Sequence, residues 1–150
     1  MWLYNNKEIT DITQFPTSTH GFIYKVTHIP TGKSYIGKKV LYFNKKVKLG
    51  KKELALQSGP GRKPTTKIVT QESDWKAYYG SEIEIKKILA EGKHNEFERV
   101  ILKLVDSKKL LTYFETKYQF VYEVLEHPDK WMNNNILGKF YSKDLLDPQK

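Results

Sequence analysis

Residues 21–39 read GFIYKVTHIPTGKSYIGKK, and the predicted fold rests on this stretch. Its two ends have the apolar and polar pattern of strands, and its centre contains Pro30 and Gly32, which favour a turn. The stretch therefore predicts a β-hairpin. Such a hairpin places Tyr24 and Tyr35, eleven residues apart in the chain, on neighbouring strands.

Periodicity outside the hairpin predicts four further elements. We expect a short strand, a helix that stops at Gly92, a third and central strand, and a long amphipathic helix ended by Pro128. Their predicted bounds are residues 1–4, 81–91, 97–105 and 107–126, beside hairpin strands at 20–28 and 34–43. Residues 44–72 are rich in Lys, Gly, Pro and Thr, which predicts a long loop.

This order of elements predicts an α+β fold, in which helices flank a small three-stranded antiparallel sheet with a long basic loop insertion. The chain has 150 residues, of which 39% are hydrophobic and 13% aromatic, so we expect a single domain over residues 1–150. We place its core at roughly residues 20–136 and the basic loop at 38–72.

Composition excludes several classes of protein. The chain has no cysteine, which rules out disulfides, thiolate zinc sites and thiol catalysis and agrees with a cytoplasmic setting. No apolar run approaches the length of a transmembrane helix, and the N-terminus lacks the charged-then-apolar layout of a signal peptide. We therefore expect an intracellular protein with no membrane partner.

The net charge of +9 is concentrated in one stretch. Residues 38–67 hold ten Lys or Arg and a single acid, Glu53, whereas the rest of the chain has sixteen residues of each sign. A local basic stretch is the electrostatic footprint of a phosphate-backbone partner. The candidate nucleic-acid contacts are Lys38, Lys45, Lys46, Lys48, Lys51, Lys52, Arg62, Lys63 and Lys67. A solvated lysine-rich loop without a partner is the alternative interpretation.

The GFIY and YIGK strings, together with the order of the predicted elements, resemble the GIY-YIG nuclease superfamily. Within that superfamily the chain resembles small phage-encoded, homing-type (Seg-like) endonucleases, and the resemblance covers roughly residues 20–136. The resemblance implies metal-dependent hydrolysis of phosphodiester bonds in DNA, with Mg²⁺ or Mn²⁺ as cofactor and no other small molecule. It leaves homing, restriction and cleavage of competitor DNA open as roles, in the cytoplasm of a phage host. No segment remains for an appended DNA-binding region, so we expect the basic loop to grip the DNA.

The same resemblance implies roles for the two motif tyrosines. It assigns Tyr24 to the activation or positioning of the attacking water and places Tyr35 in the same pocket. A phenol with a pKa near 10 is a poor base at neutral pH, but neighbouring cations favour its ionised form. Lys38 and Lys39 directly follow the second motif, so the sequence offers such cations.

Glu115, on the predicted long helix, resembles the acidic residue that binds the divalent ion in this family. The family also has a late asparagine near the metal, for which Asn133 is our candidate, with Asn135 as the alternative. The family's helical arginine has no counterpart, because the only arginines are Arg62 and Arg99. Lys76 and Lys39 are the candidate replacements, each a point charge without the arginine fork.

Two other functions remain open at this point. The missing arginine favours a non-catalytic, basic nucleic-acid-binding module on the same fold. A structural or inhibitory protein, whose basic loop binds an acidic protein, is the third hypothesis. The oligomeric state stays open.

Overall fold

The computed structural model describes residues 1–146. The chain forms two compact units. The first combines Met1–Leu41 with the chain from Asp74 onward, and the second is Tyr42–Ser73. We describe each unit by itself.

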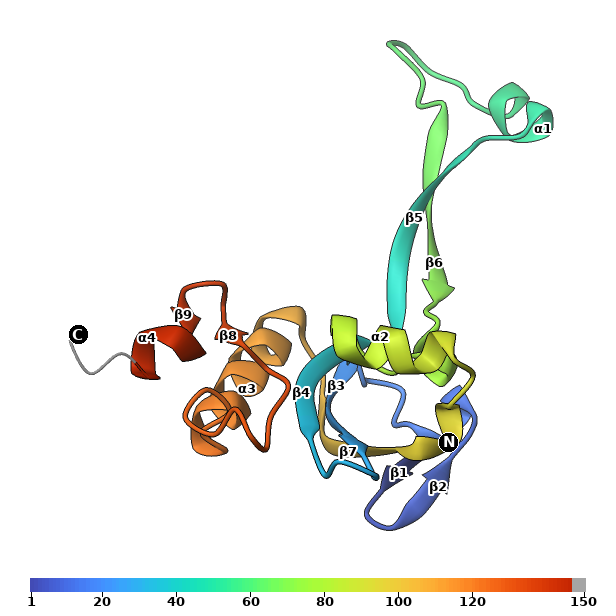
Figure 1. The fold of residues 1–150 in the computed structure, drawn as a ribbon. Helices are drawn as coiled ribbons and strands as arrows, with labels where there is room; N and C mark the ends of the chain where they lie inside the picture. The colour runs from blue at the N-terminus through green and yellow to red at the C-terminus, as the bar shows by residue number, and fades with distance from the viewer. Residues whose placement is uncertain (147–150) are drawn as a thin grey trace. The chain divides into compact units, whose positions relative to one another are not determined.

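A five-stranded sheet in the order β2-β1-β7-β3-β4 is the centre of the first unit (Figure 1). Its strands are β1 (Trp2–Tyr4), β2 (Lys7–Ile9), β3 (Gly21–His28), β4 (Ser34–Val40) and β7 (Phe97–Val105). The predicted hairpin is confirmed, because β3 and β4 pair antiparallel and β3 pairs antiparallel with β7 on its other side. Tyr24 lies directly opposite Gly37 in this register.

The sheet differs from the predicted three-stranded antiparallel sheet. Strands β1 and β2 extend it, and β1 runs parallel to β7. β1 confirms the short strand predicted over residues 1–4, but its place in this sheet was not predicted. β2 was not predicted, because its three residues are too few to show a period in the sequence. Their turn is formed by Asn5 and Asn6, both with positive φ as a tight hairpin requires. The fold is α+β, with a mixed sheet.

Helices cover both faces of this sheet. α2 (Ile83–Ala90) packs with the face that carries Tyr24, and α3 (Lys108–Val121) packs with the opposite face. The Ser107 hydroxyl caps α3 by accepting from the Leu110 backbone N–H. This helix ends five residues before the predicted end, since Glu123 adopts a positive φ of 54°. The remaining elements are η1 (Ile12–Gln14), η2 (Trp75–Ala77), η3 (His94–Glu96), β8 (Asn135–Ile136), β9 (Phe140–Tyr141) and α4 (Ser142–Leu146).

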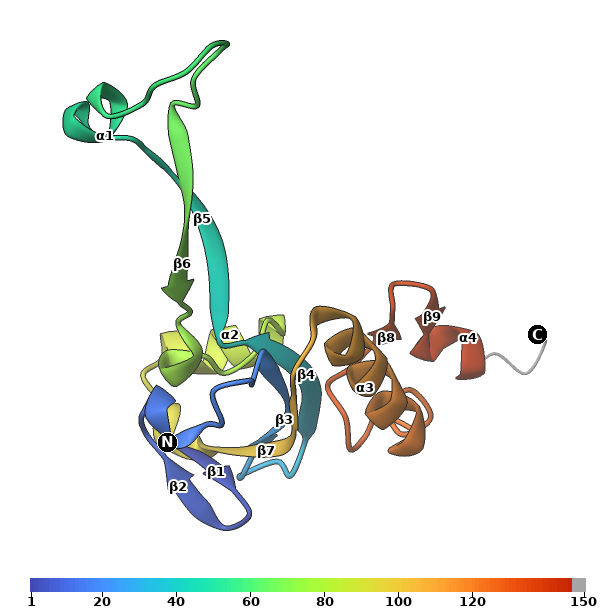
Figure 2. The same cartoon turned by 180° about the vertical axis from the view of Figure 1, so that it is seen from behind.

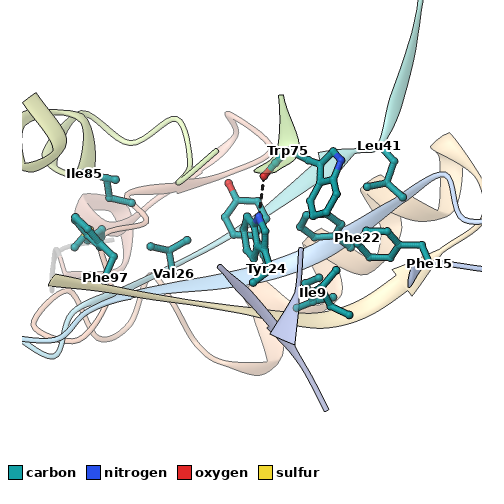
Figure 3. Close-up of a cluster of buried hydrophobic side chains, with 12 residues drawn as sticks. Ile9, Phe15, Phe22, Tyr24, Val26, Leu41, Trp75, Ile85 and Phe97 are labelled. Atoms are coloured by element: carbon teal, nitrogen blue, oxygen red, sulfur yellow. Dashed lines mark hydrogen bonds between the residues drawn. The ribbon is translucent and has the colours of Figure 1, made fainter. Parts of the chain in front are cut away.

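The core on the Tyr24 face is aromatic. Figure 3 shows Tyr24 between a group that includes Phe22, Phe15 and Trp75 and another that includes Val26, Ile85 and Phe97. The Trp2 indole donates to the Trp75 carbonyl at 2.7 Å, which ties β1 to η2. Aromatic side chains bury large areas, so a few of them suffice for a domain of this size.

The buried Arg99 on β7 holds the chain around η2 in place. Its guanidinium donates to the carbonyls of Lys76 and Tyr78 at 2.9 and 2.8 Å. The same group lies over the ring of Tyr79 at 4.1 Å and over that of Trp2 at 4.6 Å. Arg99 is therefore engaged in structure rather than open to a substrate.

The second unit is a β-ribbon with a small apical helix (Figures 1 and 2). β5 (Tyr42–Lys48) and β6 (Thr66–Glu72) pair antiparallel over seven residues each, and α1 (Lys51–Ala55) follows β5. The prediction of a loop over 44–72 is wrong for these strands. Lysines at β5 positions concealed the strand pattern, because both faces of the ribbon are exposed and no buried face imposes alternation. Residues 58–64 have no regular structure, as their Gly and Pro content predicts.

We expect Gly21→Ala to destabilise the first unit. A Cβ at this position would lie 2.4 Å from the Lys39 carbonyl oxygen and 3.0 Å from Leu111 Cδ2, so the β3–β4 ladder must shift. The expected loss is about 1–3 kcal/mol of unfolding free energy, measured as a lower urea midpoint. The control is Gly50→Ala, where φ is −71° and a Cβ has no neighbour within 4 Å. Equal midpoints for the two variants would contradict this account.

Candidate active site

The glycine of the second motif makes room for the tyrosine of the first. A Cβ on Gly37 would lie 2.4 Å from the Tyr24 hydroxyl and 2.9 Å from the Tyr35 ring. Without that carbon, the Tyr24 phenol lies over β4, the edge strand of the sheet. Gly80, with φ of 115°, approaches the same hydroxyl, where a Cβ would lie 3.3 Å away. The absence of a side chain at Gly37 and at Gly80 therefore leaves the space that the Tyr24 hydroxyl occupies.

Burial keeps Tyr24 neutral. Only 1% of the residue is exposed, and its ring centroid lies 6.3 Å from that of Tyr35 and 5.9 Å from that of Tyr78. Desolvation raises the pKa of Tyr24 well above its usual value, and the phenols of Tyr78 and Tyr35 raise it further. The expectation that lysines favour the phenolate is wrong for this environment. Tyr24 is suited to donate or accept a hydrogen bond as a phenol.

A hollow of about 220 Å³ lies beside the tyrosines, in the first unit. Its wall includes three predicted site residues: Tyr35 from β4, Glu115 from α3 and Asn133 from the segment before β8. Its other lining residues are Glu82, Gln119, Asn134, Asn135, Leu137 and Gly138. The structure thus brings together side chains that are separated by almost a hundred positions in the chain.

Glu115 is a partly buried carboxylate in this hollow. Its side chain is 19% exposed, and desolvation raises its pKa, while Lys38 acts in the opposite direction. Lys38 Nζ lies 4.0 Å from Glu115 Oε1 and donates to the Thr112 hydroxyl at 2.8 Å. The sequence had placed Lys38 among the nucleic-acid contacts, so its position at the carboxylate was missed.

The donors of the hollow fit a hydrated Mg²⁺ or Mn²⁺ ion. Glu115 and Glu82 would supply carboxylate oxygens, while the amide oxygens of Asn133, Asn134 and Asn135 each already accept a hydrogen bond. Mg²⁺ is commonly held by one or two carboxylates and keeps several waters. Within residues 1–146, no group of three or more His, Cys, Asp or Glu is placed to hold a metal ion.

Comparison with protein families agrees with this geometry. A family model described as "Putative endonuclease segE, GIY-YIG domain" matches residues 2–136. The chain belongs to this GIY-YIG endonuclease family. The matched range contains both tyrosine motifs, Glu115 and Asn133. Searches of curated proteins and of solved structures returned no match.

In this GIY-YIG domain, Asn133 holds the edge of the sheet. Its amide accepts from the Ile36 N–H at 3.0 Å and donates to the Ile36 carbonyl at 2.9 Å. Gln119 donates to the same carbonyl at 3.1 Å. Asn133 therefore satisfies the outer edge of β4 as a neighbouring strand would. The alternative, Asn135, accepts from the Gly138 N–H and donates to Asn134.

The two candidate replacements for the arginine lie in different places. Lys39 is paired with Asp74 at 2.5 Å, and its ammonium lies 4.0 Å from the centroid of the Tyr78 ring, which itself contacts Tyr24. Lys76 lines a separate hollow with Trp2, Ile9 and Thr10, among others. The structure brings Lys39, but not Lys76, toward the tyrosines.

Several neighbours of the GIY-YIG site carried no signal in the sequence. Glu82, Ser81 and Tyr78 approach it from the segment around α2, and Ser81 Oγ lies 3.5 Å from the Tyr35 hydroxyl. These residues come close to the tyrosines only in the folded chain, because α2 lies far from the hairpin in sequence. None of the helices formed by residues 1–146 is long and apolar enough to cross a lipid bilayer.

We expect Tyr24 to ionise only when the protein unfolds. Because burial raises the pKa of the folded form, stability falls as the pH rises above about 10, where an unfolded tyrosine ionises. In an absorbance titration of the native protein, Tyr24→Phe should remove one late-ionising phenol. The control is Tyr113→Phe, which removes a phenol that is 57% exposed. If Tyr24→Phe instead removes a phenol that ionises near pH 10 in the native protein, the burial argument is contradicted.

Proposed function

We propose that this protein is a metal-dependent endonuclease that hydrolyses phosphodiester bonds in DNA. The observation that carries the proposal is the hollow that joins Tyr35, Glu115 and Asn133 beside the Tyr24 phenol, in a chain of the GIY-YIG endonuclease family. Hydrolysis requires a positioned water, a group that handles its proton and stabilisation of charge on the phosphate. The hollow offers carboxylates for a metal ion, and Tyr24 and Lys38 lie near its lining residues.

Glu115, with Glu82 beside it, is the proposed ligand of Mg²⁺ or Mn²⁺. When bound, the ion stabilises negative charge on the phosphate oxygens. Tyr24 remains a neutral phenol and holds the attacking water by a hydrogen bond. Tyr35, partly buried and with its pKa also raised by desolvation, supports the same water or the phosphate as a neutral donor.

Asn133 acts as a positioning residue in this proposal. Its pairing with Ile36 fixes the wall of the hollow opposite α3, so it acts through the shape of the site. The hydrogen bonds of its amide to the β4 backbone favour this role over direct contact with the phosphate.

Lys38 and Lys39 are the cations that we place at the site. Lys38 is within reach of the Glu115 carboxylate, and Lys39 is held beside Tyr78. Each offers one positive charge to a phosphate, without the two-pronged geometry of arginine.

A non-catalytic DNA-binding module is the second candidate. In the unit that holds the hollow, the one arginine among the described residues, Arg99, is engaged by backbone carbonyls. Under this alternative, the protein binds DNA but does not cleave it. The biological role among homing, restriction and competitor cleavage depends on the target sequence.

Nicking of supercoiled plasmid in Mg²⁺ or Mn²⁺ tests the enzyme. We expect cleavage by the wild type and its loss on chelation of the metal with EDTA. Tyr24→Phe and Glu115→Gln should each lower the rate by at least about 100-fold, the usual scale for a lost proton-handling or charge-stabilising group. Glu84→Gln, at an exposed acid on α2, is the matched control and should retain activity.

Retained, salt-dependent DNA binding without any nicking by the wild type would favour the binding module. Nicking that survives Glu115→Gln but not Tyr24→Phe would refute only the assignment of Glu115 as the metal ligand.

The cation assignment has its own test. Lys38→Gln and Lys39→Gln should each reduce the nicking rate by about tenfold or more, because a developing phosphate charge loses a partner. Lys76→Gln should leave the rate near that of the wild type, since this lysine lines a different hollow. The three variants remove the same charge, so a general electrostatic effect would lower all three rates alike. A larger loss of nicking rate in Lys76→Gln than in Lys38→Gln and Lys39→Gln would restore Lys76 as the catalytic cation.

A further inference from the structure

The second unit, called the arm below (Tyr42–Ser73), has no core of its own. Every residue in it is exposed or only partly exposed, including apolar side chains such as Phe43 at 42% and Ile68 at 66% exposure. A two-stranded ribbon without a packed face is marginally stable in water. Its order is instead provided by the β5–β6 ladder, an ion pair between Lys67 and Glu53 at 2.7 Å and a bond between Thr70 and Asn44. Such an element is suited to bind a partner along its length.

Charge identifies the chemistry of that partner. The arm contains eight basic side chains and two acids, Glu53 and Glu72. The basic groups occur on β5 from Lys45 onward, at Lys67 on β6, in α1 and around the Gly and Pro turn, so they cover the apical part of the arm and most of the ribbon. Seven residues of extended strand cover about 23 Å, long enough to lie beside several successive phosphates of a nucleic acid.

The register gives the two faces of the ribbon different character. Tyr42 pairs with Glu72, Asn44 with Thr70, Lys46 with Ile68 and Lys48 with Thr66, so these side chains share one face. The other face carries Phe43, Lys45, Val47, Lys67, Val69 and Gln71. The first face, called the polar face below, therefore carries one amide, two threonine hydroxyls and two ammonium groups, with Tyr42 and Glu72 at one end of the ribbon. These groups hydrogen-bond to base edges in the major groove: asparagine to adenine, lysine to guanine and threonine to either.

One hydrogen bond orients the side-chain amide of Asn44. The Thr70 hydroxyl donates to Asn44 Oδ1 at 3.1 Å, across the two strands. This bond holds the amide plane and leaves its N–H₂ group and the second lone pair of the oxygen for a base. An asparagine prepared in this way loses less freedom on binding.

We propose that the arm inserts into the major groove of duplex DNA and reads base pairs with its polar face. The inference rests on the proposed function for the identity of DNA as partner. A B-DNA major groove, about 12 Å wide, admits a two-stranded β-ribbon, whereas the deep and narrow major groove of A-form RNA does not. The basic groups of the apical region, Lys51, Lys52, Arg62 and Lys63, then contact the phosphates that border the groove.

Selection from a random-sequence duplex DNA library tests the inference with the full chain and EDTA present. Cleavage is not required, so binding is read even if the nuclease proposal fails. We expect the wild type to enrich a sequence motif. Asn44→Ala combined with Thr70→Ala keeps the charge and should lose preference at one or two base pairs, weakening the selected duplex by about tenfold. Affinity for a scrambled duplex should not change.

The matched control is Gln71→Ala combined with Val69→Ala on the other face, which should keep both the motif and the affinity. Circular dichroism and urea midpoints check that each variant stays folded. A second readout replaces guanine by 7-deazaguanine, which removes a major-groove acceptor; it should weaken wild-type binding if Lys46 or Lys48 contacts guanine.

Three results would overturn the inference. The first is enrichment of no motif by the wild type. The second is an unchanged motif in the Asn44 and Thr70 variant, or an equal loss in the control. The third is equal affinity for single-stranded DNA or duplex RNA, which would reduce the arm to a phosphate contact. Plasmid nicking is scored separately, so loss of nicking with an intact motif refutes only the enzyme.

Discussion

Closure of the outer edge of β4 is the constraint on which the candidate site depends. The edge strand would otherwise present unpaired groups at Ile36, and the Asn133 amide satisfies both of them. The backbone continues this attachment, since the Ser34 N–H donates to the Lys130 carbonyl and the Met132 N–H donates to the Ser34 carbonyl. The segment that follows is thereby held against β4 and α3. The Asn133 side chain pairs with the edge of β4 as a sixth strand would, and the residues that follow it line the hollow.

The electrostatics of the hollow favour a divalent cation. Burial raises the pKa of Tyr24, of Tyr35 and of Glu115, so each negative form costs free energy in the absence of a compensating charge. Lys38 supplies a part of that charge to Glu115 from 4.0 Å. A metal ion would supply more at shorter range, which makes its binding favourable to the carboxylate and leaves the phenols neutral. In the proposed mechanism, this division separates the carboxylate that would bind the metal from the phenols that would hold water.

The sequence predicted those parts of the fold that have a strong local signal. The hairpin, the central strand and the two main helices follow from turn chemistry and periodicity, and the motif strings led to Tyr24, Tyr35 and Glu115. The ribbon of the arm escaped prediction because no buried face enforces alternation at positions such as Lys45 and Lys46. The location of Lys38, and the pairing of Asn133 with Ile36, depend on contacts between distant segments that no periodicity reports.

Charge is divided unevenly between the two units, and under the proposed function this division would separate recognition from chemistry. The arm carries a net +6 in 32 residues, while the rest of the chain, with eighteen basic and fifteen acidic residues, carries +3. The hollow itself is lined by two acids and five uncharged polar side chains, so it would repel DNA without a cation. Long-range attraction must then come mainly from the arm, because phosphate contacts scale with the number of basic groups. Changes in the arm should alter where DNA is held, and changes in the hollow should alter what happens to it there.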